Sequence, residues 1–89
     1  GTPAQPTPEQ IRAYVASFEA NVNKGCVQSK PQVANVAAYC RCYAASFVKR
    51  YSPNELAAMN NLAGQSPQAV QMITLMMSPE RRACEAVRR

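Results

Sequence analysis

Four cysteines are the residues of this 89-residue chain best suited to chemistry, and they are Cys26, Cys40, Cys42 and Cys84. Thiolates bind metals and attack disulfides, and paired thiols form structural disulfides. Zinc sites and redox pairs use cysteines separated by roughly two to four residues in a turn. Here the closest pair is the Cys-Arg-Cys of 40–42. An even number of cysteines without a Cys-x-x-Cys pair, in a chain this short, predicts two disulfides with three possible connectivities.

The helical pattern around residue 41 separates the two close cysteines. On a helix, Cys40 and Cys42 are about 200° apart and face opposite sides. Each therefore needs a partner in a different segment, one in the first helix and one in the last. In a hairpin that turns near residue 33, Cys26 lies opposite Cys40. This favours the pairs Cys26–Cys40 and Cys42–Cys84, while the exchanged pairs, Cys26–Cys42 and Cys40–Cys84, stay open.

Acid–base chemistry has few candidate residues. The chain has no histidine and no aspartate, so general-base and triad mechanisms lack their usual groups. Three of the five glutamates (Glu9, Glu55 and Glu80) fall in the first turn of an expected helix, where the helix dipole favours negative charge. We therefore expect a protein that is not an enzyme and that needs no cofactor.

The elements that position the cysteines are all expected to be helices. "TPEQ", "SPNE", "SPQA" and "SPER" each place a capping Thr or Ser before a proline at the first helical position. Gln10 completes a capping box with Thr7, and Glu55 completes one with Ser52. The pattern predicts helices over residues 8–28, 33–50, 53–63, 67–77 and 79–88. We expect a flexible proline-rich tail over 1–6 and a single domain over 7–89, an all-α compact bundle of about five short helices cross-linked by two disulfides.

Size and charge limit where and how the protein acts. A domain this small has a marginal core, which disulfides commonly supplement outside the cytosol. The net charge of +5 suggests an anionic partner or surface. No apolar run reaches the length of a membrane span, and the opening "GTPAQPTPEQ" is typical of a mature chain. We therefore expect a periplasmic or secreted protein, attached to a membrane only through an N-terminal tether if at all.

The order of the cysteines also carries a resemblance. Cys26, then Tyr39-Cys40-x-Cys42, then a capped "SPNEL" helix and Cys84 resemble small exported bacterial proteins that share a C…YCxC…C pattern. The resemblance implies a signal-bearing, periplasmic, disulfide-bonded helical domain. It transfers no catalytic residues to this chain.

Two features of the C-terminal half suggest a binding function. The segment 67–77 is apolar nearly all round, with Met72, Leu75 and Met76 on the face opposite Ile73. Such a helix either packs on two sides or offers a patch to a partner. Arg81 and Arg82 lie in a first turn, where the dipole disfavours them, so they are candidates for contact with an acidic partner. We expect a protein-binding module that acts as an immunity or inhibitor protein, a secretion accessory factor or a chaperone.

Two other functions compete with protein binding. Soft sulfur ligands suit Cu(I), and reduced cysteines or the four methionines (Met59, Met72, Met76 and Met77) provide them. The run "ELAAMNNLAGQSPQAVQMI" also has the spacing of a helix-turn-helix, with Gly64 at the turn. Its second helix has no Arg or Lys, however, so nucleic acid is not the favoured partner.

Overall fold

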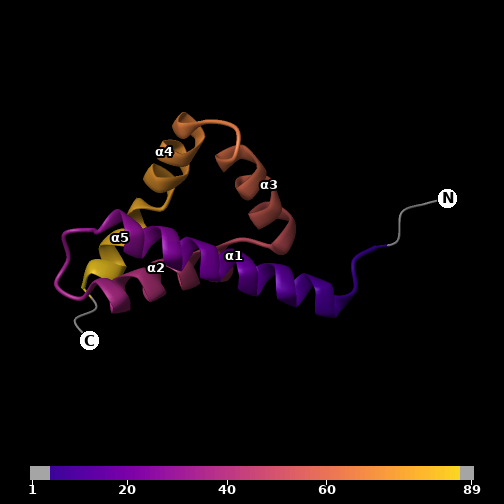
Figure 1. Ribbon diagram of the computed structural model, residues 1–89, viewed down its shortest axis with the longest axis horizontal. Helices are drawn as coiled ribbons and strands as arrows, with labels where there is room; N and C mark the ends of the chain where they lie inside the picture. Colours follow the sequence, from indigo (N-terminus) through magenta and orange to yellow (C-terminus); the bar gives the residue numbers. More distant parts are fainter. Residues whose placement is uncertain (1–4, 87–89) are drawn as a thin grey trace.

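The computed structural model describes residues 5–86, and within this range it consists of helices joined by short loops (Figure 1). No strand is present between residues 5 and 86, so the all-α prediction is confirmed. The helices are α1 (Pro8–Ser29), α2 (Val36–Arg50), α3 (Pro53–Ala63), α4 (Pro67–Met76) and α5 (Ser78–Glu85).

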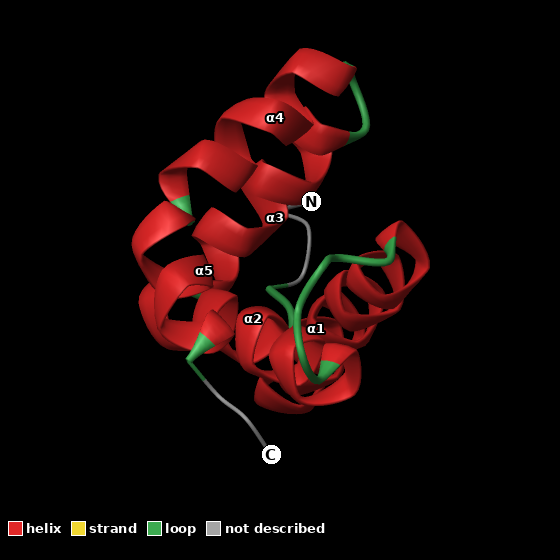
Figure 2. Cartoon of the chain, turned by 90° about the vertical axis from the view of Figure 1, so that its left-hand side faces the viewer, coloured by secondary structure: helices red, strands yellow, loops and turns green. Residues whose placement is uncertain are grey.

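The helices form two hairpins, α1–α2 and α3–α4, followed by the short helix α5. Helices α1 and α2 run antiparallel along the long axis, and the first turns of α1 extend beyond the rest (Figure 1). Helices α3 and α4 rise from this base as an arch, which we call the α3–α4 arm (residues 53–76). Helix α5 returns to α2, as the view in Figure 2 also shows. The molecule measures 52 × 28 × 21 Å.

The predicted helix starts at Thr7, Ser52 and Ser66 are confirmed. The Thr7 hydroxyl accepts from the Gln10 amide at 3.1 Å, and the Gln10 side chain accepts from the Thr7 amide at 2.9 Å. Ser52 and Glu55 make the same reciprocal pair at 3.2 and 2.8 Å. Ser66 accepts from the α4 backbone at 3.1 Å. These bonds satisfy amides that the helix itself leaves without partners.

The turn between α1 and α2 differs from the prediction at both ends. Helix α1 continues past Gly25 to Ser29 and ends where Lys30 adopts a left-handed conformation with φ of 52°. Lys30 precedes a proline, which disfavours right-handed helical geometry there. Helix α2 begins at residue 36 rather than 33, because Asn35 caps it by accepting from the Ala38 amide at 3.2 Å. Val33 therefore precedes the helix instead of belonging to it.

The prediction that Ser78 caps the last helix is wrong. Met77 alone separates α4 from α5, and its side chain is completely buried. Its amide donates to the Ile73 carbonyl at 3.1 Å, and its carbonyl accepts from the Arg81 amide at 2.9 Å. Ser78 is consequently already helical and makes no capping bond. Helix α4 thus ends, and α5 begins, one residue earlier than predicted, and the predicted end of α5 at residue 88 lies outside the described residues.

The core contains two clusters along α2. The larger cluster joins the hairpin to the arm, and its buried members are Phe18, Phe47, Leu56, Met59 and Met77. The smaller consists of Tyr39, Cys40 and Cys84. Aromatic rings at every fourth position, three in α2 and the last at its C-cap Tyr51, connect them, with successive centroids 6.2, 5.2 and 6.3 Å apart from residue 39 to residue 51. The regular spacing of these rings gives α2 an apolar stripe along one side.

Candidate functional site

Both disulfides of the favoured pairing are present. Cys26–Cys40 joins α1 to α2, and Cys42–Cys84 joins α2 to α5, each with its Cα atoms 5.6 Å apart. The two cysteines of α2 therefore bond to different helices, as their opposite orientations require. The exchanged pairing does not occur, and no free thiol is left for redox or nucleophilic chemistry.

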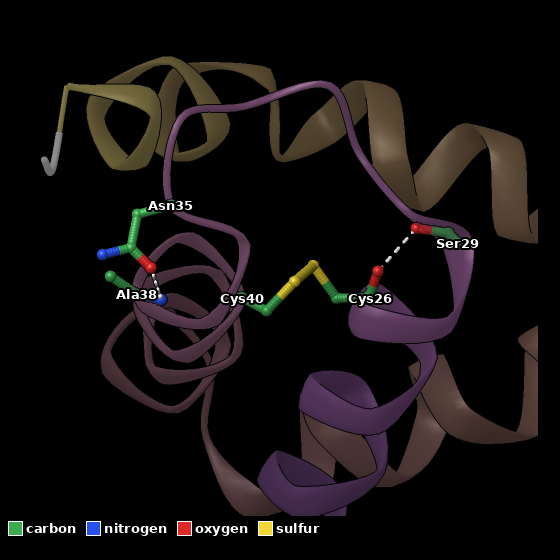
Figure 3. The surroundings of a disulfide bond; sticks show 5 residues. All are labelled: Cys26, Ser29, Asn35, Ala38 and Cys40. Atoms are coloured by element: carbon green, nitrogen blue, oxygen red, sulfur yellow. Dashed lines mark hydrogen bonds between the residues drawn. A yellow bond between two sulfur atoms is a disulfide. The ribbon is translucent and has the colours of Figure 1, made fainter. Parts of the chain in front are cut away.

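Local backbone contacts support the first disulfide on both sides (Figure 3). The Ser29 hydroxyl donates to the Cys26 carbonyl at 2.7 Å, in the last turn of α1. On the other side, the Asn35 cap begins the helix that carries Cys40. The bridge thus joins the end of one capped helix to the start of the next.

The potential metal ligands do not gather at one place. All four cysteine sulfurs are bonded in two disulfide pairs. Between residues 5 and 86, no three His, Cys, Asp or Glu side chains lie close enough to hold a metal ion. The methionines are divided, because Met59 and Met77 are buried in the core while Met72 and Met76 are exposed.

Helix α4 presents an exposed apolar surface, which we call the α4 outer face. It comprises Met72, Leu75 and Met76, whose exposed fractions are 64%, 69% and 48%. No residue of α4 is fully buried, and its contact with the larger core cluster is made by Ile73 on the opposite side. The structure therefore does not bear out the alternative that this face is a second packed face, because no described part of the chain covers it.

The two candidate arginines of α5 have different surroundings. Arg81 is half-buried, and hydrogen bonding to the Tyr39 phenol raises the pKa of its guanidinium. Arg82 is exposed. A third arginine connects the helices here, since Arg50 donates to the Glu80 carboxylate at 2.7 Å and to the carbonyl of residue 76 at 3.0 Å. Arg82 is thus better placed than Arg81 for a partner's carboxylate.

A pocket that sequence reasoning missed lies between the α3–α4 arm and the α1–α2 hairpin. Its volume is about 450 Å³, and four helices contribute to its wall. Its apolar lining comprises Phe18, Val22, Gly25, Tyr43, Phe47, Met59, Ala63, Val70 and Ile73. The angle at which the arm leaves the hairpin separates these residues enough to form the pocket, and no local pattern encodes that angle.

The fold and the two disulfides define the class as a small all-α, disulfide-cross-linked domain. Comparison with protein-family models, curated proteins and solved structures gave no match. The disulfides indicate an oxidising, non-cytosolic compartment. Within residues 5–86, no helix has the length and apolar composition needed to cross a membrane. The resemblance to exported proteins with a YCxC pattern stays a prediction.

Proposed function

We propose that this protein is a non-enzymatic, protein-binding module of the bacterial periplasm or of the secreted fraction. Its binding surface is the α4 outer face. The observation that carries the proposal is the exposure of Met72, Leu75 and Met76 on a helix that buries none of its residues completely. An immunity or inhibitor protein, a secretion accessory factor or a chaperone would use such a surface.

The chemistry of the α4 outer face suits a protein partner. Methionine side chains are flexible and polarisable, so they adapt to differently shaped apolar surfaces. Burying one such side chain fully contributes about 1.5–3 kcal/mol, and three adjacent ones can form the centre of an interface. Arg82 is exposed in the following helix and supplies a positive charge for an acidic rim.

A pair of matched double variants tests this proposal. M72S/M76S removes apolar surface from the α4 outer face, whereas V27S/L62S removes it elsewhere, at side chains that are 45% and 51% exposed. Both variants should keep a free energy of unfolding close to that of the parent chain, because the altered side chains are exposed. Capture of a partner from periplasmic extract should fail with M72S/M76S alone.

Two outcomes would contradict the proposal. Unfolding of M72S/M76S would mean that the α4 outer face belongs to the core. Equal loss of capture by V27S/L62S would mean that the contact is not confined to α4. A photo-crosslinking residue at position 75 should label the same partner that wild-type protein captures, whereas one at position 62 should not.

Cu(I) binding is the second candidate, and one observation favours it. Met72 and Met76 lie four residues apart on a helix, so their thioethers share one exposed face. Titration of the disulfide-intact protein with Cu(I) should show binding that M72S/M76S removes. DNA binding gains no such support, because α4 has no basic side chain.

A further inference from the structure

The pocket beneath the α3–α4 arm is not used by the proposed function. Its volume of about 450 Å³ falls within the roughly 300–1,000 Å³ typical of small-molecule sites. Aromatic side chains of α1 and α2 form its floor, with Phe18 and Phe47 centroids 5.7 Å apart. Met59 of α3 and Ile73 of α4 form the cover. The volume and lining of the pocket are therefore those of a small-molecule binding site.

The wall of the pocket favours an apolar occupant. No charged side chain lines it. Its hydroxyl groups already have partners inside the protein, since Ser29 donates to the Cys26 carbonyl and Thr74 donates to the Val70 carbonyl at 2.9 Å. Tyr43 is hydrogen-bonded to Thr74, and burial raises the pKa of its phenol. Two exposed amide side chains, Asn21 and Asn60, also line the pocket and can accept from or donate to a polar group near them. A charged group held among the apolar side chains would instead lose its hydration without an opposite charge to compensate.

Gly25 enlarges the pocket on the α1 side. It lies within the helix and lines the pocket, and a Cβ atom placed on it would meet no atom within 4 Å. Glycine inside a helix costs about 1 kcal/mol relative to alanine. No contact requires glycine at this position, but a large side chain here would occupy part of the space that the glycine leaves open.

The charges beside the pocket favour an anionic head group at its mouth. Lys24 directly precedes Gly25, Lys30 directly follows Ser29, and both lysines are exposed. Lys24 lies between two residues of the wall, Val22 and Gly25, and Lys30 follows the last one, although neither lysine lines the pocket itself. The whole chain carries a net charge of +5. An anion attached to an apolar chain would thus be attracted to this end of the molecule, while its apolar part enters the pocket.

The α3–α4 arm can adjust to an occupant without breaking a covalent cross-link. Both disulfides join α1, α2 and α5, and neither involves α3 or α4. The arm is held by the chain at its two ends and by apolar contacts such as those of Leu56 and Met59. Small changes in its angle would therefore alter the width of the pocket and leave the base intact.

We propose that this pocket binds the hydrocarbon chain of a single-chain anionic amphiphile, such as a fatty acid, with the carboxylate in solvent beside Lys24 and Lys30. The proposal is independent of partner binding by the α4 outer face. The two sites lie on opposite sides of α4, because the pocket uses Ile73 and the outer face uses Met72 and Met76.

Laurate, used below its micelle concentration, tests the proposal by calorimetry. We expect one laurate to bind per wild-type chain, and Gly25→Leu to weaken binding at least tenfold by filling the pocket. Gly25→Ala is the matched control and should weaken binding far less. M72S/M76S should bind as wild type does, which separates this site from the proposed partner site.

Two further measurements separate binding from a loss of folding, one on wild-type protein and one with an uncharged amphiphile as the control. In wild-type protein, laurate should shift the NMR methyl signal of Met59 and leave that of Met72 unchanged. K24Q/K30Q should weaken the binding of laurate but not that of uncharged dodecyl maltoside. Three results would overturn the proposal that laurate binds in the pocket. They are the absence of laurate binding, wild-type affinity in folded Gly25→Leu, and shifts confined to Met72. Equal effects of K24Q/K30Q on both amphiphiles would overturn the head-group assignment.

Discussion

Removal of one disulfide at a time should reveal how much each bridge contributes to the free energy of unfolding. The two bridges form a natural comparison. Each joins a buried cysteine, Cys40 or Cys84, to a half-buried one, Cys26 or Cys42. Replacing both partners by alanine therefore removes similar amounts of buried surface in C26A/C40A and C42A/C84A. The difference between the two double variants should report mainly the length of the loop that each bridge closes.

The loop lengths set the expected magnitudes. The cysteines are 14 positions apart in one bridge and 42 in the other. The chain-entropy relation assigns about 3 kcal/mol to a loop of the first size and about 4 kcal/mol to one of the second. Because the ratio of the lengths is threefold, the difference between the variants should be about 1 kcal/mol. Total stabilities of small domains are roughly 5–15 kcal/mol, so either loss is large.

Urea unfolding followed by far-ultraviolet circular dichroism provides the assay. With a slope of about 1 kcal/mol per molar urea, the midpoint of C42A/C84A should lie about 1 M below that of C26A/C40A. Reduction of wild-type protein should lower the midpoint further than either variant does. Equal midpoints, or a lower midpoint for C26A/C40A, would refute the loop-length reasoning for this chain.

Three smaller perturbations test contacts of the helices. Ser52→Ala should destabilise the protein by about 1 kcal/mol, whereas Ser78→Ala, which removes no capping bond, should change the free energy of unfolding by less than about 0.5 kcal/mol in the same urea assay. Glu80→Gln should remove the ion pair with Arg50 at a cost of less than about 1 kcal/mol, and a loss that does not shrink in high salt would contradict an electrostatic origin. Burial raises the pKa of Tyr43 above its ordinary value of 10.0, so its contribution to stability should be complete below that pH and disappear as pH rises through the folded-state pKa. An absorbance titration should show a late-ionising tyrosine that Tyr43→Phe removes, and an unchanged titration would contradict its assignment.

Local signals account for most of what the sequence predicted correctly. A capping residue followed by proline needs no tertiary information, and the helix starts at Thr7, Ser52 and Ser66 are placed as predicted. The rotation between Cys40 and Cys42 depends only on helical geometry, so it predicted that the two cysteines bond to different helices. The simple hairpin only favoured Cys26–Cys40 over the exchanged pairing, which stayed open until the structure was known. Ser78 has the same local signal, but the burial of Met77 shortens the junction and overrides it.

The candidate sites were predictable only in part. Periodicity separated Met72 from Ile73 on α4, but it could not show which face the protein would bury. The pocket depends on the angle between the α3–α4 arm and the base, which follows from packing between distant segments. Arg81 illustrates the same limit, because its contact with Tyr39 joins residues 42 positions apart in helices that only the folded chain brings together.

The placement of the two bridges on α2 determines how the protein would carry mechanical load. A pull applied before Cys26 and after Cys84 passes across the first bridge to Cys40, through Arg41 to Cys42, and across the second bridge to α5. Residues 27–39 and 43–83, which include the whole α3–α4 arm, lie outside this path. Tension between the ends would therefore leave the α3–α4 arm and the α4 outer face unstretched until the bridges are reduced, whereas Phe18, Val22 and Gly25 of the pocket wall lie on the loaded part of α1.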